Sequence, residues 1–229
     1  QILNQMAAFW FQKLADVAPN HLIDVPDPSV SVVKECRPLP VEFVYRGYLT
    51  GSTSTSIWTA YDRGEREYCG HTLPDGMIKN QKLEKNLITP TTKDDEHDEL
   101  TSAEEIVANG TLDQKAWDEM AEIALGLFAR GQELAAKNGL ILVDTKYELG
   151  LTADDELVVI DEIHTPDSSR YWYLDSYDAS MSAGEDPKPA SPLAPHAGAS
   201  VRARRARLRG LQARGPLGSR RGGRGRRRH

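Results

Sequence analysis

The stretch Val143–Arg170, VDTKYELGLTADDELVVIDEIHTPDSSR, contains two apolar segments that are interrupted by charged residues. The segments ILVDTKYEL and ELVVIDEI are rich in β-branched and aromatic side chains, which is typical of strands. We predict that they form a β-hairpin turning at Asp154-Asp155, the strongly polar gap between them. Because a buried strand does not ordinarily carry carboxylates, the charged residues in these segments indicate a further role.

The simplest register of this hairpin separates the charged residues from the apolar ones. It places Glu148 opposite Asp161, Lys146 opposite Ile163 and Asp144 opposite Thr165. Since side chains alternate between the two faces of a strand, one face then carries Asp144, Lys146, Glu148 and Asp161. The other face carries Val143, Tyr147, Leu149, Val158 and Ile160. A slip of one residue would mix the two sets.

The opposed pair Glu148 and Asp161 predicts a metal site. Like charges that face each other across two strands destabilise a sheet, and a divalent cation removes that penalty. Mg²⁺ in particular favours one or two carboxylates together with the phosphates of a substrate. We therefore predict Mg²⁺ and a phosphate-bearing substrate. The alternative is a solvated hairpin face in which Lys146 has no functional role.

Two arginines lie next to loops that could hold a phosphate. Arg46 ends an apolar strand and is followed by Thr50-Gly51-Ser52, whose backbone N–H groups and hydroxyls can meet an anion. Arg170 follows the turn Pro166–Ser169. The planar guanidinium gives bidentate contacts to phosphate, so we predict a phosphate site at Arg46, Ser52 and Arg170. Taken singly, an arginine beside such a loop is usually an ordinary surface residue, and the prediction depends on both arginines together with the acidic hairpin.

The other patterns outline a mixed fold. A helix is expected over residues 1–16, and strands over 31–36 and 41–49. A hairpin is expected from IWTAY and REYCG, and residues 71–100 should be mostly loop. Ser102 and Glu105 have capping-box spacing and predict a short helix to about Ala108. A longer helix is expected over Asp113–Lys137, ended by Asn138-Gly139. Its buried side should contain Trp117, Ala121, Ala124, Leu125 and Phe128.

The net charge of −6 conceals two different compositions. Residues 1–182 carry 15 basic and 32 acidic side chains, whereas residues 183–229 carry 13 basic and 2 acidic ones. The basic segment has no Phe, Tyr, Trp or Ile, so we predict that it is disordered. Either it attracts nucleic acid through counterion release, or it is a translation artefact of GC-rich DNA read in a wrong frame or through an intron.

Composition also limits the class of protein. The chain has 39% apolar residues, enough for a core, but no apolar run near the ~20 residues of a membrane span. Its two cysteines are too few for a disulfide framework, which favours a reducing compartment. The chain begins with Gln1 and enters a helical pattern at once, so we expect it to be a fragment of a longer protein.

Three segments of this chain resemble the SAICAR synthetase family of purine-biosynthesis enzymes. They are PVEFVYRGYLTGS at Pro40–Ser52, LVDTKYELG at Leu142–Gly150 and DEIHTPDSSRYW at Asp161–Trp172. GSTSTSIWTAY, TPTTKDDEHD and LILVDTKYE are most similar to plant and green-algal members. The resemblance extends over about Gln1–Tyr177. It implies an α+β, two-lobed fold with antiparallel sheets, packed helices and the nucleotide between the lobes.

The resemblance also implies a division of the chain and an activity. Residues 1–44 would be an incomplete remainder of the N-terminal, ATP-binding lobe, residues 45–180 the catalytic lobe, and residues 181–229 the disordered tail. The family joins carboxyaminoimidazole ribonucleotide to L-aspartate, with ATP and Mg²⁺, through an acyl phosphate. Similarity to plant members implies a plastid location, with the cytoplasm as the alternative, and no membrane is expected as a partner.

Site residues follow from the same resemblance. Arg46, Ser52 and Arg170 would hold the ribonucleotide phosphate, and Lys146 would lie near the substrate carboxylate. ATP would be bound by Lys93, Glu148 and Asp161, with the metal at Glu148 and Asp161. The substrate side would further contain Asp144, His97, Asp98 and Asp167.

Two departures from the family pattern predict low turnover by this chain. A Gly-Lys-type loop and an Asp-Arg segment that begin the family are absent before Gln1, and the DK-x-F-x-R stretch of the family is absent after SSRYW. Two rival functions remain open at this point. One is a different kinase or carboxylate-activating ligase that uses ATP, and the other is a non-catalytic protein that binds nucleic acid through its arginine-rich tail.

Overall fold

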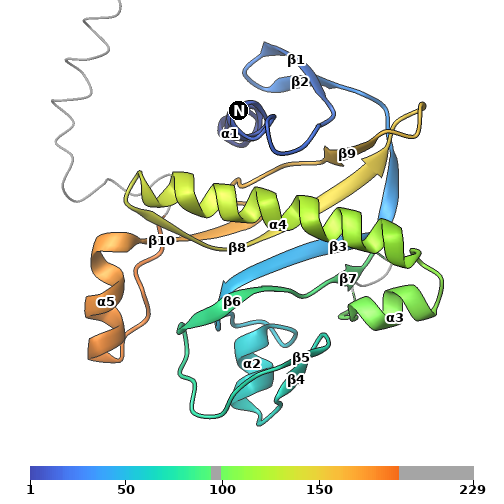
Figure 1. The fold of residues 1–229 in the computed structure, drawn as a ribbon. Helices are drawn as coiled ribbons and strands as arrows, with labels where there is room; N and C mark the ends of the chain where they lie inside the picture. The colour runs from blue at the N-terminus through green and yellow to red at the C-terminus, as the bar shows by residue number, and fades with distance from the viewer. Residues whose placement is uncertain (94–98, 191–229) are drawn as a thin grey trace, which may run out of the picture. The chain divides into compact units, whose positions relative to one another are not determined.

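The computed structural model describes residues 1–93 and 99–190 of the chain. Its helices are α1 (Ile2–Lys13), α2 (Ile57–Asp62), α3 (Ala103–Ala108), α4 (Gln114–Ala136) and α5 (Leu174–Ala183). Its strands are β1 (Leu22–Asp27), β2 (Val30–Val33), β3 (Arg37–Tyr48), β4 (Glu67–Tyr68), β5 (His71–Thr72), β6 (Lys82–Ile88), β7 (Thr91–Thr92), β8 (Leu140–Leu151), β9 (Leu157–Ile160) and β10 (Ser169–Tyr173). The expected α+β class is confirmed (Figure 1).

One six-stranded antiparallel sheet organises the fold. Its strand order is β10-β8-β3-β6, with β7 paired to β3 and β9 paired to β8. The long helix α4 lies along β8 and β3, as Figure 1 shows. Two small hairpins, β1-β2 and β4-β5, complete the strands. This arrangement leaves the sheet with one face against α4 and one face free for polar side chains.

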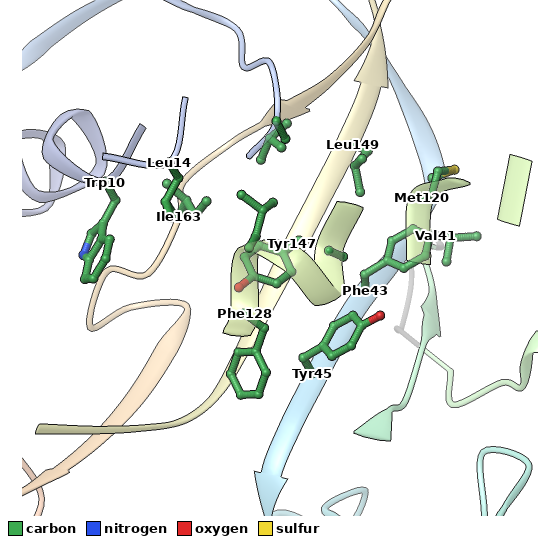
Figure 2. Close-up of a cluster of buried hydrophobic side chains, with 14 of the residues drawn as sticks. Trp10, Leu14, Val41, Phe43, Tyr45, Met120, Phe128, Tyr147, Leu149 and Ile163 are labelled. Carbon is green, nitrogen blue, oxygen red and sulfur yellow. The ribbon is translucent and has the colours of Figure 1, made fainter. Parts of the chain in front are cut away.

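The core lies between α4 and one face of β3 and β8 (Figure 2). Phe43 and Tyr45 of β3 and Tyr147 and Leu149 of β8 point into it, with Phe128 of α4 packed against them. These strand residues have the odd numbers, because alternation sends the even-numbered residues to the opposite face. The sequence pattern of β3 and β8 therefore determines which side chains can form a site.

Several elements agree with the sequence prediction. α1 and α4 occupy the predicted segments, and Ser102 caps α3 with the full capping box. On α4, Trp117, Ala124 and Phe128 are buried as expected. Leu125, however, is 44% exposed, because Met120 and Leu127 take the positions nearest the sheet. The prediction thus identified the buried side of α4 correctly, but it wrongly included Leu125.

Three local predictions were wrong. IWTAY forms the helix α2 instead of a hairpin strand, and the short hairpin β4-β5 lies just after it. β1 was not predicted, and it contains Pro26 one residue before its end. The predicted loop 71–100 contains the edge strand β6, whose Leu83 and Leu87 pack on α2 in a second small core. Tertiary packing decided each of these segments.

The β8-β9 hairpin exists, but its predicted register was one residue out. Glu148 pairs with Ile160, and Leu151 pairs with Leu157. The reason lies in the connection between the strands. Thr152 N–H donates to the Glu156 carbonyl at 3.0 Å, which leaves a three-residue loop, 153–155, whose last residue, Asp155, has a left-handed φ of 58°. Such a loop is a standard alternative to a two-residue turn. Val159, in place of Val158 and Ile160, therefore joins the main core, although all three are buried.

Beyond Ile160 the partner of β8 changes. Asp161 has a left-handed φ of 62° and ends the strand, so Ile163 and Thr165 do not pair with β8 as predicted. β10 pairs there instead and sets Arg170 opposite Asp144. A register shift after Arg170 also moves Val143 away from Tyr147, into a small cluster formed with Tyr48, Ile141 and Trp172.

The expected boundaries of the domains stay predictions, although the structure describes the first residues of the expected tail. The tail was expected to begin at residue 181, but α5 runs to Ala183 and residues 188–190 bond to β10. Residues 191–229 lie outside the described residues, so the predicted disorder of that segment stays a prediction. The division at residue 44 also stays a prediction, although β3 runs across it. No helix in the described ranges is long and apolar enough to cross a membrane.

Candidate functional site

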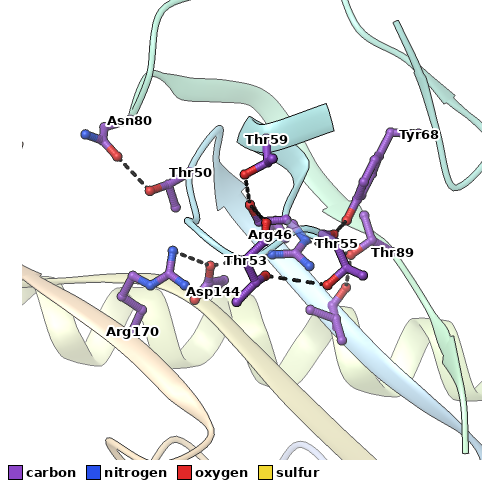
Figure 3. Close-up of polar contacts among 12 residues, drawn as sticks. Arg46, Thr50, Thr53, Thr55, Thr59, Tyr68, Asn80, Thr89, Asp144 and Arg170 are labelled. Atoms are coloured by element: carbon purple, nitrogen blue, oxygen red, sulfur yellow. Dashed lines mark hydrogen bonds and ion pairs between the residues drawn. The ribbon is translucent and has the colours of Figure 1, made fainter. Parts of the chain in front are cut away.

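Three charged residues form a row across the free face of the sheet. Arg46 of β3 is paired with Asp144 of β8, which is paired in turn with Arg170 of β10. The Arg46 Nη1 atom lies 3.8 Å from Asp144 Oδ2, and the Arg170 Nη1 atom lies 3.4 Å from the same oxygen. Figure 3 shows both guanidinium groups beside Asp144. Neighbouring strands thus bring together residues that are far apart in the sequence.

The row carries an excess of positive charge in a partly buried place. The side chains of Arg46 and Asp144 are 12% and 11% exposed, whereas that of Arg170 is 42% exposed. Asp144 Oδ2 is buried and, within the described residues, accepts no hydrogen bond, so it interacts with both arginines only as a charge. Burial raises the pKa of the Asp144 carboxyl, and the charges of Arg170 and Arg46 oppose that shift. Two cations around one anion leave N–H donors free for another anion.

A polar loop lies beside this row. Residues 50–56 form this loop, which connects β3 to α2. Arg46 is held separately, because its Nε donates a hydrogen bond of 2.9 Å to Thr89 Oγ1, between β6 and β7. Gly51 has φ +117°, and a β-carbon there would lie 2.3 Å from the Ser56 β-carbon. Only glycine therefore permits this turn. The Thr55 carbonyl accepts a hydrogen bond from the Tyr68 hydroxyl at 2.6 Å, and the centre of the Tyr68 ring lies 6.0 Å from the Arg46 guanidinium carbon (Figure 3). Ser52 is exposed within the loop.

A second charged group lies further along the same two strands. Glu42 of β3 is paired directly with Glu148 of β8, and both are nearly buried, at 5% and 9% exposure. Lys146 Nζ donates to Glu42 Oε1 at 2.8 Å and lies 3.3 Å from Glu148 Oε1. Lys93 donates to Glu148 Oε2, and Thr91 Oγ1 donates to Glu42 Oε2 at 3.0 Å. Two carboxylates are thus neutralised by two lysines.

The pKa shifts of this group follow from these contacts. Burial alone would lower the pKa of Lys146, but the hydrogen bond and charge of Glu42, together with the charge of Glu148, raise it above its ordinary value. Burial alone would raise the pKa of Glu148, but hydrogen bonds and charges from Lys93 and Lys146 lower it. Lys146 and Glu148 are therefore both ionised at neutral pH.

The structure does not bring all of the predicted site residues together. Asp161 is not paired with Glu148, which lies opposite Ile160, and it lines a surface pocket with Asn4 and His21. Burial lowers the pKa of His21, and the charge of Asp161 opposes part of that shift. Asp167 is exposed, and its backbone N–H donates a hydrogen bond to Thr165 Oγ1. His97 and Asp98 lie outside the described residues.

Sequence reasoning missed Glu42, the buried carboxylate that actually opposes Glu148. The principle that opposed carboxylates need a cation was right, but the partner strand was β3 instead of β9. A signal was available, because Glu42 and Arg46 lie four residues apart in one strand and so share a face. Thr91 and Thr89 could not have been found, since they lie in a segment predicted as loop.

The described residues fit Mg²⁺ only in a limited way. Across residues 1–93 and 99–190, no three His, Cys, Asp or Glu side chains are grouped to hold a metal ion. Glu148 is the one predicted ligand on the charged face, and lysines already neutralise it. One carboxylate suits a magnesium ion that is mainly held by the phosphates of a nucleotide, but not one that the protein binds alone.

With this geometry in place, comparison with known proteins identifies the family. The SAICAR synthetase family description matches residues 1–188. The chain belongs to the SAICAR synthetase family. The match reaches Lys188, so it extends beyond Tyr177, where the resemblance of the motifs was expected to end. The motifs at Pro40–Ser52 and Leu142–Gly150 lie in β3 and β8, the two strands that carry the charged face.

Curated relatives have both bacterial and plant origins. The phosphoribosylaminoimidazole-succinocarboxamide synthase of Legionella pneumophila (strain Lens) is 55% identical over 188 residues, covering 82% of this chain and 60% of that protein. The chloroplastic enzyme of Arabidopsis thaliana is 50% identical, covering 82% of this chain and 46% of that protein. The chain therefore spans about half to three fifths of the length of these SAICAR synthetases.

Solved structures confirm the SAICAR synthetase fold. The SAICAR synthase of Saccharomyces cerevisiae, solved in complex with SAICAR, has a TM-score of 0.67 at 28% identity. The match covers 77% of this chain and 63% of the yeast chain. A SAICAR synthetase in complex with ADP has a TM-score of 0.63 at 22% identity, covers 81% of this chain and is covered to 74%. The second likeness concerns the fold alone.

Proposed function

We propose that this chain is the part of a SAICAR synthetase that binds the ribonucleotide and contributes to the nucleotide site. The whole activity would join carboxyaminoimidazole ribonucleotide to L-aspartate and form SAICAR, ADP and phosphate. The observation that carries this proposal is the row Arg46–Asp144–Arg170, an incompletely neutralised anion site on a family-matched sheet. The named relatives and the SAICAR complex of the yeast enzyme support the same assignment.

In this proposal the arginine row holds the 5′-phosphate of the ribonucleotide. Arg46 is fixed by Thr89 and by Asp144, so it offers an oriented guanidinium at little entropic cost. Arg170 is more exposed and can turn its fork toward the incoming anion. Ser52, on the adjacent loop, would add a hydroxyl donor. Asp144 keeps the two arginines from repelling each other.

The second charged group would then act near the reacting carboxylate and ATP. Lys146, held cationic by Glu42, would attract the substrate carboxylate. That carboxylate attacks the γ-phosphorus of ATP, the bond to ADP breaks, and an acyl phosphate forms. The amine of aspartate then attacks the acyl carbon, phosphate leaves, and the amine loses a proton. Lys93 would neutralise charge on the transferring phosphoryl group.

Magnesium would enter this site with the nucleotide. Glu148 is the residue that would contact it, and it would exchange its bond to Lys93 for that contact. When bound, the ion would stabilise the negative charge of the phosphates during transfer. Asp161 remains a predicted second ligand by family resemblance. His97, Asp98 and Asp167 likewise remain predicted residues of the substrate side.

Two measurements on the full 229-residue chain test this function. The first is calorimetric binding of SAICAR, which we expect to be measurable and to be lost when Arg46 and Arg170 are both replaced by Met. The second is ADP release with ATP and carboxyaminoimidazole ribonucleotide, with and without L-aspartate. Absence of SAICAR binding at millimolar concentration would overturn the proposal. ADP release that follows another amine or an alcohol instead of aspartate would favour the rival ligase or kinase.

We propose a plastid location, on the strength of the chloroplastic relatives. The bacterial relatives are as similar and support the cytoplasm equally. Imaging a fluorescent fusion of the complete gene product would separate the two.

A further inference from the structure

A buried asparagine connects the polar loop of the site to a distant part of the chain. Thr50 Oγ1, directly before Gly51-Ser52, donates a hydrogen bond of 2.6 Å to Asn80 Oδ1 (Figure 3). Asn80 Nδ2 in turn donates to Asp186 Oδ1 at 2.8 Å. Thr50 and Asn80 are each only 4% exposed. Two consecutive bonds thus join the loop to the segment that follows α5.

The backbone of Asn80 is used as fully as its side chain. Its N–H donates to the Leu49 carbonyl at 2.7 Å, and its carbonyl accepts from the Tyr177 hydroxyl at 2.8 Å. Its φ of 66° is left-handed, a conformation that asparagine and glycine tolerate better than other residues. Asparagine is therefore the residue that can adopt this backbone and also provide both an acceptor for Thr50 and a donor for Asp186.

The segment that carries Asp186 is itself attached to the strand of Arg170. Tyr173 N–H donates to the Lys188 carbonyl at 3.2 Å, and Ala190 N–H donates to the Tyr171 carbonyl at 2.8 Å. Both bonds are made by β10, which begins at Ser169 next to Arg170. The residues after α5 thus contact both sides of the candidate phosphate site, the arginine strand directly and the loop through Asn80.

We propose that Asn80 and Asp186 are positioning residues for the phosphate subsite, which they serve by fixing Thr50 and hence the Gly51-Ser52 turn. This inference rests on the proposed function, because it needs that turn to contact the ribonucleotide phosphate. Neither residue touches the phosphate. Their effect is to hold the loop in the conformation in which its N–H groups and the Ser52 hydroxyl meet the anion.

The test compares a ligand with and without its phosphate. Binding of SAICAR and of its dephosphorylated nucleoside to the full chain is measured by calorimetry. Asn80→Asp keeps the acceptor for Thr50 and a side chain compatible with the backbone, but it sets a carboxylate against Asp186. Asp186→Ala removes the acceptor at an exposed position. We expect each variant to weaken SAICAR binding about tenfold, as the loss of one charge-assisted hydrogen bond does, and to leave nucleoside binding unchanged.

Matched variants separate positioning from general destabilisation. Asp186→Asn retains an oxygen that accepts from Asn80 and should bind SAICAR within about twofold of the wild type. Lys79→Ala removes only the exposed ion pair with Asp186 and should likewise change little. If Asn80→Asp does not fold, Asp186→Ala gives the same comparison, because its side chain is 68% exposed.

The outcomes distinguish this inference from the proposed function. A wild-type chain that prefers SAICAR to the nucleoside, with variants that keep the full preference, overturns the positioning role alone. Equal losses for SAICAR and nucleoside also overturn it, because they indicate a general structural effect. If the wild-type chain binds SAICAR and the nucleoside equally well, it has no phosphate site, and both proposals are overturned.

Discussion

The two charged groups on the free face of the sheet differ in how completely they are neutralised. The Arg46–Asp144–Arg170 row has two cations for one anion, and its ion-pair distances of 3.4 and 3.8 Å leave Asp144 Oδ2 without a hydrogen bond among the described residues. The Glu42–Lys146–Glu148–Lys93 group has equal numbers of each charge and closes its contacts by hydrogen bonds. In both groups the members that come from β3 and β8 are even-numbered residues, whereas Arg170 comes from β10 and Lys93 follows β7.

The comparison indicates how each group would meet a ligand. A row with excess positive charge can accept an anion without first breaking a bond of its own. A closed group must exchange an internal ion pair for the ligand, so its affinity includes the cost of that exchange. We therefore expect mutations in the first group to act on anion binding, and also on stability where they leave the buried Asp144 without its main partner. Those in the second group should act mainly on stability and on its dependence on pH.

The largest effect is expected from Arg46→Met. This change leaves the buried Asp144 with only the more exposed Arg170, and an uncompensated buried charge costs about 3 kcal/mol of unfolding free energy. Urea unfolding followed by circular dichroism measures the loss. Arg46→Met/Asp144→Asn should recover part of it, because the unpaired charge is gone. A loss below about 1 kcal/mol in the single variant would mean that Asp144 is solvated or protonated.

Arg170→Met should weaken the binding of SAICAR while leaving the free energy of unfolding nearly unchanged. The Arg170 side chain is 42% exposed, so its ion pair with Asp144 contributes less than about 1 kcal/mol to folding. Its loss should nevertheless weaken SAICAR binding about tenfold or more, as for one charge-assisted hydrogen bond. Calorimetry and urea unfolding on the same sample give both quantities. A stability loss equal to that of Arg46→Met would remove the distinction between the two arginines.

The sequence was sufficient for the strands that carry the site but not for their partners. Alternation in VEFVYRGY and VDTKYEL correctly grouped Asp144, Lys146 and Glu148 on one face, because a sheet with one buried side enforces that period. Which strand lies next to β8 is a long-range property. The loop that ends at Asp155 sets Glu148 opposite Ile160 instead of Asp161. The strand β9 ends before the left-handed Asp161, and the carboxylate opposite Glu148 is Glu42 of β3.

Other features depended on contacts that a local pattern does not contain. Asn80 and Asp186 are 106 residues apart, and nothing in either segment indicates the other. α2 and β6 were misassigned because their stability comes from packing on each other, with Ile57 and Leu83 in one small core. Local propensity decides such short elements weakly. The long helix α4, with a cap at Asp113 and a clear apolar stripe, was predictable for the opposite reason.

The closed group should respond to acid through Glu148. Its pKa is lowered in the folded state, so its contribution to stability is present above the ordinary value of 4.5 and is lost as the pH falls through the folded value. Lys93→Met removes the hydrogen bond and charge that most oppose the effect of burial, so the pKa of Glu148 should shift upward and the loss of stability on acidification should become smaller than in the wild type. Urea midpoints between pH 3 and 7 measure this shift.

A control for that experiment is Lys34→Met, which removes an exposed lysine–glutamate pair elsewhere in the chain. It should leave the pH dependence unchanged, because exposed pairs contribute little. If Lys93→Met gives the same curve as Lys34→Met, the contact of Lys93 with Glu148 has no thermodynamic weight. The second charged group would then be open rather than closed.

The smallest effect is expected at Thr91, which donates to the buried Glu42 Oε2 at 3.0 Å. Thr91→Val keeps the shape of the side chain in β7 but removes the donor, and the net loss of one such bond is about 1 kcal/mol. Thr92→Val, at the next position of the same strand, removes only the acceptor of a longer bond of 3.3 Å from the exposed Glu99 N–H, and should change stability by less than about 0.5 kcal/mol. Equal effects of the two would show that Lys146 alone satisfies Glu42. The two charged groups would then differ only in the number of their charges and not in the completeness of their hydrogen bonds.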